Sequence, residues 1–301
     1  MLKFLARRIL FIISVSIFIV FFVFLGMGMA SNSERSEPNF DLVEPGLVAW
    51  GQTTTFFSNI SQGEWGNFQT STGEIPLNEF LRDAYINSMG LLLVALVGSA
   101  LIGVTLGGIA ALSKRTSLGL LTVTVLGISA PSFFAALLLQ QGAIRYQDAF
   151  QQRLVSVAGF GWDVQHMLLP VLVLAARPLA YLTRSSFISF DGIMKQDYIR
   201  TATAKGLRRS GVVLIHAFKN IAVPVLTAVS VSLRFSLSTL PVVEFFFAWP
   251  GLGLRLIEAI NGRQTEVVVA LAFALGLTFL IVNLLLDVIY RMIDPRLRSE
   301  E

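Results

Sequence analysis

The chain contains no cysteine, and histidine occurs only twice, at His166 and His216. The absence of cysteine excludes a disulfide framework, a thiolate nucleophile and a cysteine-ligated metal site. With only two histidines, few side chains are available to bind a metal ion or to transfer a proton. We therefore expect no metal site and no cofactor bound by this chain.

Charge is also scarce, because charged residues make up 14% of the 301 residues, against about 25% in soluble domains. Four uncharged runs cover 9–33, 84–113, 116–144 and 267–286. Since about 20 apolar residues cross a bilayer as a helix, these runs predict a membrane protein with several spans. A single soluble core, a disordered chain and a nucleic-acid binder are excluded, despite the net charge of +4.

Two further apolar stretches are interrupted by arginines, which brings the prediction to an all-α membrane protein with six helices. The first helix follows Lys3, Arg7 and Arg8, as in a signal peptide, but its apolar part of about 21 residues exceeds the usual stretch of roughly 7–15. We interpret it as a membrane span. The predicted helices lie near 9–30, 85–112, 118–141, 165–190, 221–247 and 267–290.

The distribution of basic residues predicts the orientation, because cytoplasmic loops of membrane proteins are enriched in lysine and arginine. With a cytoplasmic N-terminus, six basic residues lie outside and 14 of the 23 lie inside, namely Lys3, Arg7, Arg8, Lys114, Arg115, Lys195, Arg200, Lys205, Arg208, Arg209, Lys219, Arg291, Arg296 and Arg298. We therefore expect both termini in the cytoplasm.

Three parts follow from this order of spans: the first helix (1–30), an extracytoplasmic segment (31–84) and a core domain (85–298). The segment 31–84 is polar enough to be a small insertion over the outer mouth. Its aromatic residues could lie at the lipid interface or contact an extracytoplasmic partner. Residues 142–163 are predicted to form a second outside loop.

The longest inside loop, 191–220, carries the most specific pattern. Residues 196–205 are good helix formers, and Gly206 follows as a helix stop. Ser210 could cap a second short helix. A loop kept positive only for topology would explain the charge, but not the small residues 201–204 beside Gly206, which allow close docking into a partner.

The sequence of this loop resembles the cytoplasmic coupling motif of ABC-importer permeases. It reads DYIRTATAKGL at 197–207, HAFKN at 216–220 and VPVLT at 223–227. Further stretches resemble the dipeptide, oligopeptide and nickel permeases, in order along the chain: SAPSF at 129–133, HMLLP at 166–170, TRSS at 183–186, EFFFAWPGLG at 244–253, NLLLD at 283–287 and DPR at 294–296.

The resemblance implies a type I ABC importer transmembrane domain in a bacterial or archaeal cytoplasmic membrane. The chain would be a permease subunit forming half of the translocation path, with a coupling helix at about 197–220. Its partners would be a second, related permease subunit, two cytosolic ATPase subunits, an extracytoplasmic substrate-binding protein and membrane lipid. The residues expected to contact the ATPase are Tyr198, Arg200, Ala202, Ala204, Lys205, Gly206, Leu207 and Arg208.

The chain itself is not expected to be an enzyme. None of its five lysines follows a glycine, as a phosphate-binding loop requires, so ATP and magnesium would be used by the partner subunits. Peptides are the expected cargo, with oligosaccharides or nickel as the alternatives. An ATP-independent channel or carrier and an intramembrane enzyme are the rival classes, and the sequence contains no spacing of catalytic residues for the latter.

Two groups of residues are candidates for transport itself. Arg177 and Arg234 fall inside predicted spans, where a charge is costly and suggests function. Either they line a wet path and attract an anionic group, or they pair with an acid of the second permease subunit. At the outer end of the fifth span, an outer gate is predicted from Glu244, Trp249, Pro250 and Gly251; the alternative is a helix end anchored at the lipid interface by Trp249.

Overall fold

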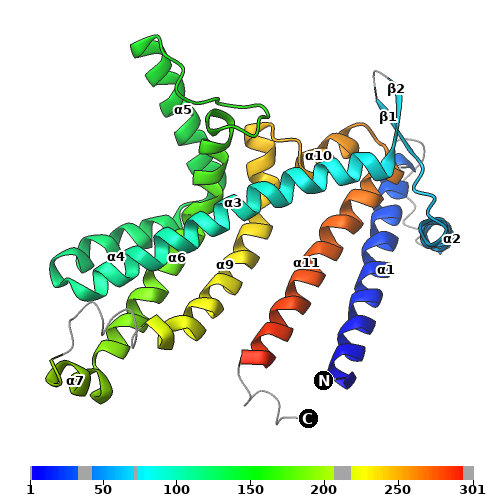
Figure 1. Ribbon diagram of the computed structural model, residues 1–301. Coiled ribbons are helices and arrows are strands. Elements are labelled where there is room, and N and C mark those ends of the chain that lie inside the picture. The colour runs from blue at the N-terminus through cyan, green and yellow to red at the C-terminus, as the bar shows by residue number, and fades with distance from the viewer. Residues whose placement is uncertain (1, 33–42, 71–72, 207–217, 294–301) are drawn as a thin grey trace. The chain divides into compact units, whose positions relative to one another are not determined.

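The computed structural model describes residues 2–32, 43–70, 73–206 and 218–293 (Figure 1). The chain forms two compact units, one made of residues 1–88 with 250–287 and the other of 89–249 with 288–301. Five of the described helices are long and apolar enough to cross a membrane: α1 (Leu2–Asn32), α3 (Leu77–Leu112), α6 (Val164–Met194), α9 (Phe218–Phe247) and α11 (Thr265–Ile293). They correspond to five of the six predicted spans.

In the first unit, α1 and α11 run side by side (Figure 1). Gly276 of α11 allows this approach, because a Cβ there would lie 2.5 Å from Cδ1 of Ile19. Near the predicted cytoplasmic ends, Nη2 of Arg8 lies 2.5 Å from Oδ2 of Asp287. The two helices are thus joined by a close apolar contact at Gly276 and by an ion pair at one end.

The segment between α1 and α3 is more ordered than the sequence predicts. It contains α2 (Val43–Ser61) and the antiparallel hairpin of β1 (Asn67–Thr70) and β2 (Gly73–Pro76). The hairpin leads into α3, whose residues Leu77 and Leu81 are buried against Leu252 of α10 (Leu252–Asn261) and Val267 of α11. The expectation of an all-α fold is therefore wrong in this one detail.

In the second unit, α6 and α9 pack against each other, and α4 (Lys114–Ser129) and α5 (Ser132–Phe150) pack against this pair. Glycines bring α3 onto α6: a Cβ at Gly107 would lie 2.5 Å from the carbonyl oxygen of Thr183, and one at Gly103 would lie 2.9 Å from Cβ of Leu182. Leu91, Leu174, Leu240 and Val243 belong to the buried core of this unit.

The third predicted span, 118–141, is not a single helix in the structure. It is divided between α4 and α5, with Pro131 at the N-cap of α5 in an extended conformation. Proline has no N–H to donate, and it disfavours helical geometry at the preceding residue, so the helix ends before it.

The predicted loop 142–163 is also shorter than expected, because α5 continues to Phe150 and ends at Gln151 with φ 54°. The polar residues near the end of α5 are compatible with helix. Their polarity was the basis for predicting a loop at these positions.

Candidate coupling helix and transport residues

The coupling motif forms a short helix, α7 (Asp197–Ala204), directly after α6. Ile199 and Ala202 are buried, and they pack against Ile193 and Met194 at the end of α6. Residues three apart lie on the same face of a helix, so this pair anchors α7 to the membrane helix that precedes it.

The predicted end of this helix is confirmed. The N–H of Lys205 donates to the carbonyl of Thr201, and that of Gly206 donates to Thr203. Gly206 has φ +80°, a backbone conformation that glycine adopts without steric cost. The chain therefore turns sharply away from α7 at this residue.

The residues expected to contact the ATPase divide into two groups. Tyr198, Arg200, Ala204, Lys205 and Gly206 are exposed and available to a partner. Ala202 is only 7% exposed, and its small side chain permits α7 to pack inward on α6. Leu207, Arg208 and the second helix predicted from Ser210 lie outside the described residues.

The exposed face of α7 is linked to α9 and is polar. Nδ2 of Asn220, near the start of α9, donates to the hydroxyl of Tyr198 at 3.1 Å. Nη1 of Arg200 lies 3.5 Å from Oδ1 of Asp197, one turn before it. The hydroxyl of Tyr198 thus connects the coupling helix to a second membrane helix.

The two candidate path arginines lie on the paired helices, Arg177 on α6 and Arg234 on α9, and both are partly buried. The guanidinium carbon of Arg177 lies 5.6 Å from the ring centroid of Phe235, within the range of a cation–π contact. The ring of Tyr181, one turn further along α6, meets the same phenylalanine edge-on. The structure thus provides Arg177 with an aromatic contact on the neighbouring helix, which the sequence alone does not reveal.

Three serines of these helices add polar atoms that the sequence reading did not single out. Within the described part of the chain, the hydroxyls of Ser186, Ser232 and Ser236 are buried and make no hydrogen bond. Buried polar groups normally find a partner. In the sequence, the spacing of Ser232 and Ser236, one turn apart on α9, is the feature that indicates these polar positions.

Just after the C-terminal end of α9, Trp249 is fully buried and contacts the rings of Phe160 and Trp162, at centroid distances of 4.9 and 5.4 Å. The Trp249 ring is therefore covered by protein, and its contacts are with aromatic side chains of the same unit. A Cβ at Gly90 would lie 2.2 Å from the Trp162 ring, so only glycine fits beneath this aromatic cluster.

The helix end itself is tightly hydrogen-bonded. The N–H of Trp249 donates to the carbonyl of Glu244, and that of Ala248 donates to Phe245. With Ala248 at φ 50°, this is a Schellman arrangement whose left-handed position is occupied by alanine rather than the usual glycine. The side chain of Glu244 is fully buried in the same turn.

The other two residues of the predicted gate, Pro250 and Gly251, belong to the first unit. The carbonyl of Pro250 accepts a hydrogen bond of 3.0 Å from Nδ2 of Asn87. Gly251 is the N-cap of α10, and the next N–H, that of Leu252, donates to the hydroxyl of Ser88 at 2.8 Å. Both residues are therefore held by side chains of α3.

The start of α6 has a small polar cluster. Asp163 caps the helix by accepting from the N–H groups of Gln165 and His166. The hydrogen bond with the His166 side chain holds the pKa of the Asp163 carboxyl below its usual range, and the backbone bond from His166 adds to this. No group of three or more potential metal ligands occurs among the residues in the described ranges.

Comparison with known proteins agrees with these features. Residues 103–299 match the family described as the binding-protein-dependent transport system inner membrane component. The glutathione transport system permease protein GsiC of Escherichia coli is 31% identical over 300 residues, covering 96% of this chain and 94% of GsiC. GsiC of Salmonella typhimurium is 32% identical over 246 residues, covering 81% of this chain and 78% of the relative. This similarity over most of the chain identifies it as a member of the family of binding-protein-dependent transport system inner membrane components.

Proposed function

We propose that this chain forms half of the translocation path of an ATP-driven importer whose cargo is peptides. The observation that carries the proposal is α7, which is anchored by Ile199 and Ala202 and exposes Tyr198, Arg200 and Lys205. Such a helix can transmit the motion of a cytosolic partner to α6 and α9 as rigid bodies. The peptide cargo rests on the relatives, whose names assign them to glutathione transport.

The proposed complex contains this chain, a related second permease subunit, two ATPase subunits and an extracytoplasmic binding protein. ATP and magnesium are used by the ATPase subunits, and this chain binds no cofactor. Leu207 and Arg208 extend the ATPase contact beyond α7. Arg177 and Arg234 line the path and attract an anionic group of the cargo, while Glu244, Trp249, Pro250 and Gly251 form the outer gate.

The proposed topology has six crossings with both termini in the cytoplasm. The third crossing is made by the broken segment of α4 and α5, in place of one continuous helix. Residues 31–84 then form an extracytoplasmic insertion between the first helix, 1–30, and the core domain, 85–298. The distribution of basic residues supports this orientation.

The deciding experiment reconstitutes the chain with its permease partner, ATPases and binding protein in lipid nanodiscs and measures ATP hydrolysis. We expect hydrolysis to rise several-fold when the liganded binding protein is added. An ATP-independent channel or carrier would show no such stimulation, and this result would refute the proposal.

The cargo is tested separately by identifying the ligand that co-purifies with the binding protein. A peptide is expected. If nickel or an oligosaccharide co-purifies instead, the proposal of an importer is unaffected, but the assignment of peptides as its cargo is refuted.

A further inference from the structure

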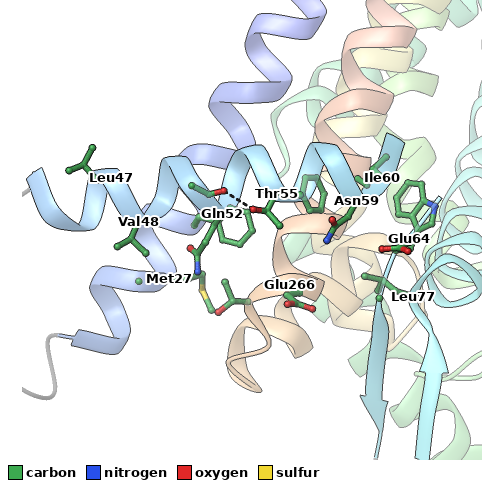
Figure 2. A pocket seen from close by; sticks show the side chains of 17 residues that line it. Met27, Leu47, Val48, Gln52, Thr55, Asn59, Ile60, Glu64, Leu77 and Glu266 are labelled. Carbon is green, nitrogen blue, oxygen red and sulfur yellow. Dashed lines mark hydrogen bonds between the residues drawn. The ribbon is translucent and has the colours of Figure 1, made fainter. Parts of the chain in front are cut away.

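The first unit contains a cavity of about 590 Å³ that no transport step described above uses (Figure 2). It is bounded by the outer end of α1, by α2, by the turn before β1 and by the first turn of α11. Its volume lies within the range of small-molecule sites, roughly 300–1,000 Å³.

One end of the cavity is acidic. The carboxylates of Glu64 and Glu266 line it together with the carboxamide of Asn59, and Figure 2 shows these three side chains gathered at the same end. None of the lining residues is lysine, arginine or histidine. Two carboxylates in a concave, partly apolar surface concentrate negative potential.

Both carboxylates are exposed, and within the described residues neither side chain makes a hydrogen bond or an ion pair. Glu266 lies in the first turn of α11, where a negative charge stabilises the helix N-terminus. No such role exists for Glu64, which follows the end of α2 at the turn of Gly63.

The other end of the cavity is apolar. Leu47 and Val48 of α2 line it and are 70% and 56% exposed, and Met27 of α1 lies nearby, away from Glu64 (Figure 2). Exposed large apolar side chains beside a pocket favour an apolar ligand group. The acidic end and the apolar end together favour a ligand that has one cationic part and one apolar part.

We propose that this cavity binds a cationic amphiphile, a molecule in which a protonated amino group is attached to an apolar chain. The amino group donates hydrogen bonds to Glu64, Glu266 and Asn59, and the apolar chain lies against Leu47, Val48 and Met27. An apolar peptide with a free N-terminus has this chemistry, and phosphatidylethanolamine offers the same ammonium group, attached in that lipid to a phosphodiester that makes it zwitterionic. This site is independent of the proposed importer function.

The test uses the full chain in phosphatidylcholine nanodiscs and isothermal titration calorimetry with leucyl-leucinamide, which carries one ammonium group and no carboxylate. Its N-acetylated form is the neutral control. We expect the free amine to bind at least about tenfold more tightly than the acetylated form, and Glu64→Gln or Glu266→Gln to weaken its binding about tenfold, because each removes a hydrogen bond to a charged group.

Glu44→Gln is the matched control, since it removes the same charge from the exposed first turn of α2 outside the cavity; binding is expected to stay within twofold. Equal binding of the amine and its acetylated form, or an equal loss in all three variants, would overturn the proposal. So would an absence of amine binding combined with a loss of binding-protein stimulation in Glu64→Gln, which would assign the cavity to protein docking.

Nanodiscs in which a third of the lipid is phosphatidylethanolamine separate the two sources of the ligand. A weaker apparent affinity for leucyl-leucinamide there supports the site with the lipid headgroup as its resident ligand. An unchanged affinity supports the site with a soluble amine as its ligand.

Discussion

At the scale of single residues, the absence of a side chain decides how closely two membrane helices approach. Gly103 and Gly107 of α3 lie against the backbone of α6 near Leu182 and Thr183. Small residues allow such contacts in membranes, where apolar packing against lipid competes with packing against protein. Gly98, on the same helix, has no heavy atom within 4 Å of a built Cβ.

Gly107→Ala is therefore expected to destabilise the protein by about 1–3 kcal/mol, the usual cost of overpacking, because its Cβ would meet the carbonyl oxygen of Thr183 at 2.5 Å. Gly98→Ala should be neutral or slightly stabilising, since alanine favours helix over glycine. Thermal unfolding of the two variants in detergent measures the difference. Equal midpoints would show that α3 and α6 do not pack this closely.

Arg177 is the residue at which cargo selection is predicted. Its guanidinium lies over Phe235, so its position is fixed in part by an aromatic ring rather than by a carboxylate. Arg177→Ala and Arg234→Ala are each expected to lower uptake of an acidic peptide at least fivefold, which corresponds to about 1 kcal/mol, the upper end of the range for an ion pair in contact with water, and to affect a neutral peptide less.

Uptake of the two peptides by reconstituted vesicles measures this preference, with Arg177→Lys restoring most of it by restoring the charge. Unchanged uptake and unchanged preference in both alanine variants would exclude the path-lining role. The arginines would then be assigned to a structural pairing with the second permease subunit.

At the scale of elements, α7 contacts the membrane helices α6 and α9 at few positions among the described residues. Its inward face consists of Ile199 and Ala202, packed on Ile193 and Met194. Its outward face is joined to α9 by the hydrogen bond between Asn220 and Tyr198. A helix held at so few points depends strongly on each of them.

Ile199→Ala is expected to loosen this attachment by about 2 kcal/mol, the lower end of the range for a buried isoleucine. Binding-protein-stimulated hydrolysis and peptide uptake should fall together several-fold, while the unfolding midpoint of the membrane helices changes little. Thr201→Ala, at an exposed position of the same helix, is the control and should retain activity. If stimulated hydrolysis and peptide uptake are unchanged in Ile199→Ala, the proposed transmission of motion through α7 is contradicted.

At the scale of the whole molecule, the proposed topology can be tested directly because the chain has no cysteine. Single cysteines at Thr54 and Gln152 are expected to react with a membrane-impermeant maleimide in spheroplasts. Cysteines at Ser113 and Thr201 should react only after the membrane is permeabilised. These four positions report the side on which each loop lies.

The pair Ser113 and Gln152 tests the third crossing, since the whole of α4 and α5 lies between them. Labelling of both from the same side would show that this broken segment does not cross. The wild-type chain, which has no thiol to label, is the negative control for every sample.

Much of the architecture was predictable because helix formation in a membrane is local. Apolar length alone identified α1, α3, α6, α9 and α11, and Gly206 identified the end of α7. Pro131 also indicates the break between α4 and α5, although the uncharged run 116–144 continues through it. The sequence of α2, β1 and β2 predicts these elements only weakly, because its apolar residues do not recur at a regular helical or strand spacing.

The sequence by itself determined that the chain is a membrane protein, where most spans lie and which loop resembles a coupling motif. Only the tertiary structure decided that Ala202 faces inward, that Trp249 is covered by Phe160 and Trp162, and that Glu64 and Glu266 share a cavity. The reason is physical: in a membrane protein, faces that contact lipid and faces that contact helices are both apolar. Composition therefore identifies the span, while the neighbour of each side chain depends on packing between segments far apart in the chain.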